Sequence, residues 1–149
     1  MEVTIRQIHL LPTLIHWRRE ILENAAGAAP SKRMVADTRR YYQDHIADGS
    51  HIAVMAEADG VGVGFGAISI TEELPSPDNP SGRCARLTDV YVQNEYRSKG
   101  IGQKIVRWLV DKAAQSGCGA IWLEADGALS LYRRAGFVEA HGIMKQTLQ

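Results

Sequence analysis

The sequence contains only two cysteines, Cys84 and Cys118, which excludes the disulfide framework of a small secreted domain. No cluster of histidines and cysteines has the spacing of a metal site, and no apolar run approaches the length of a membrane span. The first ten residues, MEVTIRQIHL, lack the apolar core of a signal peptide. An excess of one charge is also missing, because 17 basic residues balance 17 acidic ones. We therefore expect a cytoplasmic protein that has no metal and binds neither nucleic acid nor a membrane.

The remaining composition is that of an ordinary globular protein. Of the 149 residues, 45% are hydrophobic and 23% are charged, which is sufficient for a core that needs no metal or disulfide. No internal repeat, linker or low-complexity segment interrupts the chain. We expect one domain that spans residues 1–149.

Hydrophobic periodicity predicts an alternation of strands and helices. Strands are expected at residues 3–7, 51–57, 61–70, 87–92 and 120–124, and a last strand at 137–138, which residues 144–148 continue or pair with. Helices are expected at residues 10–24, 32–47, from about 101 to 113, and 128–135. Ser31 is expected to cap the second helix, and Gly27 to follow the end of the first. This order alone indicates an α/β or α+β fold.

Three glycines, Gly62, Gly64 and Gly66, leave one side of the strand 61–70 without side chains. A bulged or tightly packed strand would explain them. Clearance for a neighbouring loop or a ligand is the alternative.

The stretch from Leu87 to Lys112 places a strand, a glycine-rich turn and an amphipathic helix in succession. The turn, RSKGIG at residues 97–102, brings two glycines and two cations to the point where the helix begins. A helix N-terminus has unpaired backbone N–H groups and a partial positive charge, and glycines let an anion approach them. The pattern predicts a cradle for a pyrophosphate. It is neither a Walker loop nor the dinucleotide fingerprint.

The strand, the Arg-x-x-Gly-x-Gly turn and the helix together resemble motif A of the GNAT superfamily of N-acetyltransferases. A second block, ALSLYRRAGF at residues 128–137, resembles motif B of that family. The resemblance covers roughly residues 84–137. It implies an α/β (α+β) acyl-CoA acyltransferase fold, in which a mixed, splayed sheet of about six to seven strands is flanked by about four helices.

The resemblance also implies an activity, the transfer of an acetyl group from acetyl-CoA directly to a primary amine of a small molecule or peptide. Backbone groups of Val90, Tyr91 and Val92 would contact the pantetheine arm, and the Val92 amide would polarise the thioester carbonyl. The pyrophosphate would be held by the turn, which comprises Arg97, Ser98, Lys99, Gly100, Ile101 and Gly102. A homodimer that forms through an edge strand near residues 144–148 is a further implication.

Two side chains are candidates for the chemistry. The amine must lose a proton before it attacks, and Asp89 is the carboxylate within the strand 87–92. Regular alternation would place Asp89 on one face with Leu87 and Tyr91. Alternatively, Asp89 faces solvent or pairs with Arg83 or Arg86, and Glu72, Glu73, Glu124 or a water chain takes the proton. By resemblance to motif B, Tyr132 is the general acid that protonates the departing thiolate; a packed helix aromatic is the alternative.

The sequence says less about the acceptor. Carboxylates that suit a cationic amine would gather near the acceptor side, namely Glu72, Glu73, Asp78, Asp89 and Asp126. Trp17, Tyr41 and Tyr42 would either line the same cleft or belong to the core. Two other functions stay open, a CoA-binding regulatory module that has lost transfer and a nucleotide binder that uses the same cradle.

Overall fold

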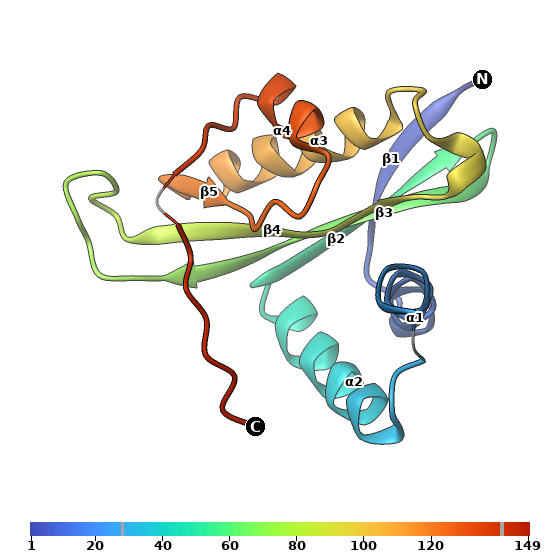
Figure 1. Ribbon diagram of the computed structural model, residues 1–149, viewed down its shortest axis with the longest axis horizontal. Coiled ribbons are helices and arrows are strands. Elements are labelled where there is room, and N and C mark those ends of the chain that lie inside the picture. The colour runs from blue at the N-terminus through green and yellow to red at the C-terminus, as the bar shows by residue number, and fades with distance from the viewer. Residues whose placement is uncertain (28, 141) are drawn as a thin grey trace.

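The computed structural model describes residues 1–27, 29–140 and 142–149. Its centre is a five-stranded sheet in the order β1-β2-β3-β4-β5, formed by Val3–Ile8, His51–Ala58, Val61–Glu72, Arg83–Val92 and Ala120–Trp122. The first four strands are antiparallel neighbours, and β5 is parallel to β4. Helices α1 (Leu11–Ala26) and α2 (Lys32–Ala47) cover one face, and α3 (Ile101–Gln115) and α4 (Leu129–Arg134) cover the other (Figure 1). This arrangement confirms the predicted α/β (α+β) class with a mixed sheet and four helices.

The capping residues in the sequence predicted helix ends that the structure has. Ser31 caps α2, because its hydroxyl accepts a hydrogen bond of 3.2 Å from the backbone N–H of Met34. Gly27 ends α1 in the left-handed region with φ of 70°, and its N–H donates to the carbonyl of Glu23. None of the helices within the described residues is long and apolar enough to cross a membrane.

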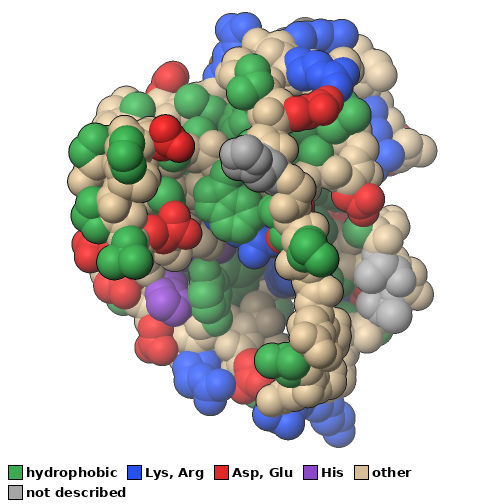
Figure 2. Space-filling model, turned by 60° about the vertical axis from the view of Figure 1, so that its left-hand side comes forward, with side chains coloured by type: hydrophobic (Ala, Val, Ile, Leu, Met, Phe, Trp, Pro, Cys, Tyr) green, Lys and Arg blue, Asp and Glu red, His purple; other side chains and the backbone are tan. Residues whose placement is uncertain are grey.

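The predicted number of strands was too high, because neither 137–138 nor 144–148 forms a strand. Among the described residues, those that follow α4 run as an irregular segment past the sheet, along a hollow in the surface (Figures 1 and 2). Beyond Phe137, apolar side chains of this segment are in solvent, with Val138 87% and Met144 97% exposed. Strand β5 has only three residues, so its outer edge offers few backbone partners to a further strand. Residues 144–148 therefore do not form the edge strand that we expected to mediate a dimer.

The glycines of β3 allow α3 to lie against the sheet. A Cβ added to Gly66 would lie 2.5 Å from Cγ2 of Ile105 and 3.0 Å from Cδ1 of Leu109, and one added to Gly64 would lie 3.1 Å from Cδ1 of Ile105. Ile105 and Leu109 are fully buried in the core between α3 and the sheet. At these two positions the glycines serve tight packing, as predicted.

Gly62 does not share the side of Gly64 and Gly66. Its added Cβ would meet Sδ of Met55 at 2.8 Å and Cζ2 of Trp17 at 3.3 Å, on the face that α1 covers. The pairing register of β2 with β3 shifts between Ala56 and Glu57, and this irregularity reverses the alternation of side chains.

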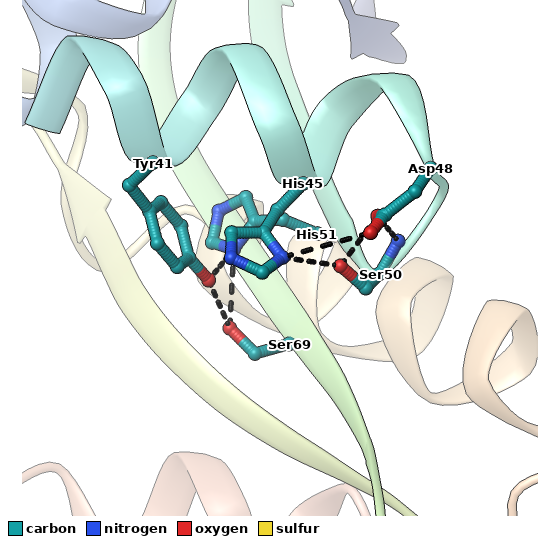
Figure 3. Close-up of polar contacts among 6 residues, drawn as sticks. All are labelled: Tyr41, His45, Asp48, Ser50, His51 and Ser69. Atoms are coloured by element: carbon teal, nitrogen blue, oxygen red, sulfur yellow. Dashed lines mark hydrogen bonds and ion pairs between the residues drawn. The ribbon is translucent and has the colours of Figure 1, made fainter.

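A polar cluster fills the contact between α2 and the sheet (Figure 3). The Tyr41 hydroxyl from α2 lies 2.9 Å from Nδ1 of His51 in β2 and 3.0 Å from the Ser69 hydroxyl in β3. His51 is 5% exposed. Burial, with smaller contributions from His45 and Arg18, lowers the pKa of His51 to about 4. The imidazole is therefore neutral at pH 7.

We predict that Gly66→Ala lowers the free energy of unfolding by about 1–3 kcal/mol, because the new methyl group overlaps the branched side chain of Ile105. Urea unfolding of the two proteins measures the difference. Gly142→Ala is the matched control, because a Cβ there meets nothing within 4 Å and Gly142 has no positive φ. Equal losses in both variants would contradict the packing role of Gly66.

We also predict that acid destabilises the protein through His51. The folded-state pKa of about 4 lies below the ordinary value of 6.5, so protons favour the unfolded chain. The stability that this histidine contributes is complete above pH 6.5 and is lost as the pH falls through 4. The loss reaches at most about 3 kcal/mol. Urea unfolding from about pH 7 to about pH 4.5 should show a weaker pH dependence for His51→Gln; parallel curves would contradict the prediction.

Candidate active site

The chain enters α3 through a turn that leaves the start of the helix open. Ser98 and Gly100 both adopt positive φ, 61° and 82°, and Gly100 is the N-cap of α3. A Cβ on Gly100 would meet nothing within 4 Å. The first backbone N–H groups of an α-helix have no acceptor within the helix, so here they face an accessible space. This geometry suits a phosphate group.

The cations of the turn take different positions. Arg97 folds back on β4, where its Nε donates a 2.8 Å hydrogen bond to the Val92 carbonyl and its guanidinium lies 5.7 Å from the centre of the Tyr91 ring. Arg97 also lines the cavity at the start of α3. Lys99 is exposed and is not among the described residues that line the adjoining cavity.

A cavity of about 460 Å³ lies between the end of β4, the turn, the start of α3 and α4. We call it the donor-side cavity. Most of the predicted cofactor-binding residues line it, as does the predicted acid: Val90, Tyr91, Val92, Arg97, Ser98, Gly100, Ile101, Gly102 and Tyr132. The structure thus brings together the two sequence blocks that the motifs indicated.

Tyr132 projects from α4 and is half-buried. Its ring packs edge-on against Phe137, with the ring centres 6.0 Å apart. Burial raises the pKa of the phenol above its ordinary value of 10.0, which keeps the hydroxyl protonated at neutral pH. Tyr132 is therefore a packed aromatic residue that lines the donor-side cavity and has a protonated hydroxyl group.

Strand β4 is bulged at Asp89. The residues Phe65 and Ala67 of β3 pair with Tyr91 and Thr88, so that Gly66 alone lies opposite both Asp89 and Val90. Asp89 takes the left-handed conformation, with φ of 57°. The bulge breaks the alternation that we expected for this strand.

The faces of β4 differ from the prediction for the same reason. Leu87 belongs to the core beneath α3, whereas Asp89 and Tyr91 face α1 and α2. The pairing of Asp89 with Tyr91 on one face was correct, and its pairing with Leu87 was wrong.

Asp89 pairs with Arg18 of α1, a partner that the sequence did not indicate. Nη1 of Arg18 lies 2.6 Å from Oδ1 of Asp89, and the Asp89 side chain is only 11% exposed. Burial raises the pKa of Asp89 and outweighs the opposing effects of Arg18, of a hydrogen bond from Thr88 and of Arg86. The expected alternatives, pairing with Arg83 or Arg86, do not occur.

A second cavity, of about 360 Å³, lies on this face of the sheet beside α2. We call it the acceptor-side cavity. Figure 2 shows a face of the molecule that has a hollow in its surface. The residues that line it are Arg18, Asp37, Thr38, Tyr41, Tyr42, His51, Ser69, Arg86, Thr88 and Asp89. Burial and the nearby Asp89 carboxylate raise the pKa of Tyr42.

The predicted acidic wall does not form. Of the five carboxylates that we expected near the acceptor, only Asp89 is among the described lining residues. Glu72 pairs with Arg83 at 3.9 Å and Glu73 accepts a hydrogen bond from the Cys84 thiol, both near the far end of the β3–β4 hairpin. Asp78 and Asp126 lie in exposed loops. The long hairpin, in which β3 and β4 extend beyond the expected ends, places the loop away from the bulge.

The aromatic candidates divide between core and cavity. Trp17 is 3% exposed and stacks on Phe65, with ring centres 6.0 Å apart. Tyr42 is as deeply buried, yet Tyr41 and Tyr42 both line the acceptor-side cavity. Sequence reasoning missed His51 and Ser69 there. Each is a polar residue in an apolar strand, and that contrast is the signal that could have identified them.

Comparisons with known proteins agree with this geometry. The family described as "Acetyltransferase (GNAT) family" matches residues 12–137. A thialysine N-epsilon-acetyltransferase from Sus scrofa is 30% identical over 137 residues, which cover 74% of this chain and 79% of that protein. Glucosamine 6-phosphate N-acetyltransferase 1 from Oryza sativa subsp. japonica is 26% identical and covers 79% of this chain and 72% of its own.

The fold has a solved counterpart as well. The crystal structure of a predicted acetyltransferase with acetyl-CoA from Clostridium acetobutylicum aligns with a TM-score of 0.84 at 21% identity, covering 98% of this chain and 96% of that one. The predicted GNAT fold is thus confirmed, with fewer strands than expected. The chain belongs to the GNAT family and is an acetyl-CoA-dependent N-acetyltransferase.

Proposed function

We propose that the protein transfers the acetyl group directly to a primary amine of a small molecule, and that the two cavities receive the two substrates. One observation carries this proposal. Thr88 and Asp89 line the acceptor-side cavity, and the next residues, Val90 and Tyr91, line the donor-side cavity. The two cavities therefore approach each other at the bulge of β4, where a direct transfer needs the amine and the thioester to meet.

The donor-side cavity fits acetyl-CoA, which supplies the thioester. The open N-terminus of α3 and the free end of the Arg97 side chain would hold the pyrophosphate. Val90, Tyr91 and Val92 line the cavity between there and the bulge, and their backbone groups would bind the pantetheine arm. The Clostridium acetobutylicum structure contains acetyl-CoA, which supports acetyl-CoA as the donor.

Asp89 would receive the proton of the amine as the new nitrogen–carbon bond forms. Its carboxylate is buried, and the raised pKa makes it a stronger base than an exposed aspartate. Arg18 at 2.6 Å favours the ionised form and offsets part of the effect of burial. Names of the relatives support an amine acceptor, because thialysine and glucosamine 6-phosphate both carry one.

Tyr132 would donate its proton to the thiolate as the carbon–sulfur bond breaks. A phenolate with a raised pKa is more basic than a thiolate, so Tyr132 does not ionise on its own. It donates its proton because the breaking carbon–sulfur bond places negative charge on the departing sulfur. At the end of the reaction Asp89 holds the proton of the amine, and the proton of Tyr132 is on the CoA thiol. Proton transfer from Asp89 to the Tyr132 phenolate by exchange with water restores both groups.

We predict that Tyr132→Phe lowers kcat by roughly 100-fold or more and leaves CoA affinity intact, because the ring still packs against Phe137. Thiol release from acetyl-CoA measures turnover against polyamines, aminoglycosides, amino acids and short peptides, and calorimetry measures CoA binding. Tyr96→Phe removes a hydroxyl from the same cavity and is the control. Tight CoA binding by the wild type without turnover on any amine would favour a regulatory module, and absence of CoA binding would refute the proposed function.

We predict that kcat/KM falls on the acidic side as Asp89 takes up a proton, at a pH above that expected for an exposed aspartate. Asp89→Asn should reduce kcat/KM by roughly 100-fold at neutral pH and abolish this acidic limb. Asp37→Asn alters a half-exposed carboxylate on the rim of the same cavity and should keep the limb. An unchanged limb in Asp89→Asn would assign the base to another group or to water. Unfolding curves and CoA affinity verify that the loss is not one of folding.

A further inference from the structure

The acceptor-side cavity is balanced in charge. Two guanidinium groups and two carboxylates line it. Asp89 is paired with Arg18 at 2.6 Å, and Asp37 is paired with Arg40 at 2.8 Å along α2. Because each carboxylate already has a cation beside it, the cavity presents no excess negative field to a polycation. An acceptor with charges of both signs matches this lining better.

Arg86 is the lining cation that is available to a ligand. Its guanidinium lies 5.1 Å from the centre of the Trp122 ring, a contact that orients its plane. Its ion pair with Glu124, at 3.2 Å, joins side chains that are 46% and 54% exposed. Exposed pairs of this kind contribute about 0–1 kcal/mol. Arg86 is therefore held in position by the indole and only weakly by Glu124, and a ligand carboxylate can take the place of Glu124.

Arg86 and Asp89 are close enough for one small ligand to contact both. They are three residues apart on β4 and line the same cavity. Three residues of a regular strand span roughly 10 Å, and the bulge at Asp89 makes this an upper bound for the distance between the two backbone positions. An extended diamino acid has a similar length between its side-chain nitrogen and its carboxylate. Three residues with hydroxyl groups, Tyr41, Ser69 and Thr88, also line this cavity, and such groups can hydrogen-bond a polar ligand.

We propose that the acceptor is an amino acid with an aliphatic side-chain amine, whose carboxylate binds Arg86 while its side-chain amine lies at Asp89. This inference rests on the proposed acetyl transfer and adds the chemical class of the acceptor. It assigns Arg86 as a residue that determines specificity. The relevant feature is that one half-exposed arginine, Arg86, which stacks on the Trp122 ring, and one buried aspartate, Asp89, line the same cavity.

The test compares three amines as acceptors, L-lysine, its carboxamide lysinamide, and the diamine cadaverine. Thiol release gives kcat and KM, and mass spectrometry of the product identifies the acetylated nitrogen. We expect kcat/KM for lysine to exceed that for the two amines without a carboxylate by about tenfold or more, with the acetyl group on the side-chain nitrogen. Arg86→Gln should raise the KM for lysine by about 10–100-fold and bring the preference for lysine close to one.

Two further variants control the experiment. Glu124→Gln removes the competing carboxylate and should lower the KM for lysine, a change opposite in sign to that of Arg86→Gln. Arg6→Gln removes a distant surface arginine, which pairs with Glu57, and should leave the preference unchanged. Equal use of cadaverine and lysine by the wild type, or a preference that survives Arg86→Gln, would overturn the inference while the transferase function stands. Turnover on no amine would overturn the proposed function and this inference with it.

Discussion

The ion pair between Arg18 and Asp89 is the contact on which the rest of the site depends. Asp89 occupies a bulge with positive φ, a conformation that is unfavourable for a residue other than glycine. Its carboxylate is also buried, and a buried carboxylate without a cation would lose several kcal/mol of solvation. Arg18 meets both needs, because it neutralises the charge and ties the bulge to α1. The position of α1 is thereby linked to the strand where the two cavities approach each other.

The opposite face of the same strand pair has its own constraint. Gly66 lies opposite the bulge, and the absence of a side chain there lets Ile105 and Leu109 of α3 rest on the sheet. Because α3 is rigid, this contact also fixes its N-terminus at the end of β4, where Gly100 leaves the backbone open. One position of β3 therefore accommodates the bulge on one side and α3 on the other. The donor side and the acceptor side are positioned by adjoining residues.

The sequence predicted those parts of the structure that depend on local spacing. The turn at 97–102, the cap at Ser31 and the motif B helix all follow from neighbouring residues, and the structure has them where they were expected. Asp89 was a candidate because a carboxylate in an apolar strand is unusual. Its partner Arg18 is 71 residues away and gives no local signal. The bulge was also hidden, so alternation placed Leu87 on the wrong face, and the acidic wall was inferred from charges whose loops point elsewhere.

The buried polar groups of the acceptor side have a common physical cause. Burial opposes the charged forms of both His51 and Asp89, so it lowers the pKa of the imidazole and raises the pKa of the carboxyl group. Arg18 adds a smaller effect in both cases, since its positive charge lowers the pKa of each group, which favours the charged aspartate and disfavours the charged histidine. A single arginine on α1 thus contributes to the charge state of both groups. An acceptor that entered with only positive charge would oppose Arg18, whereas one that brings its own carboxylate leaves this balance intact.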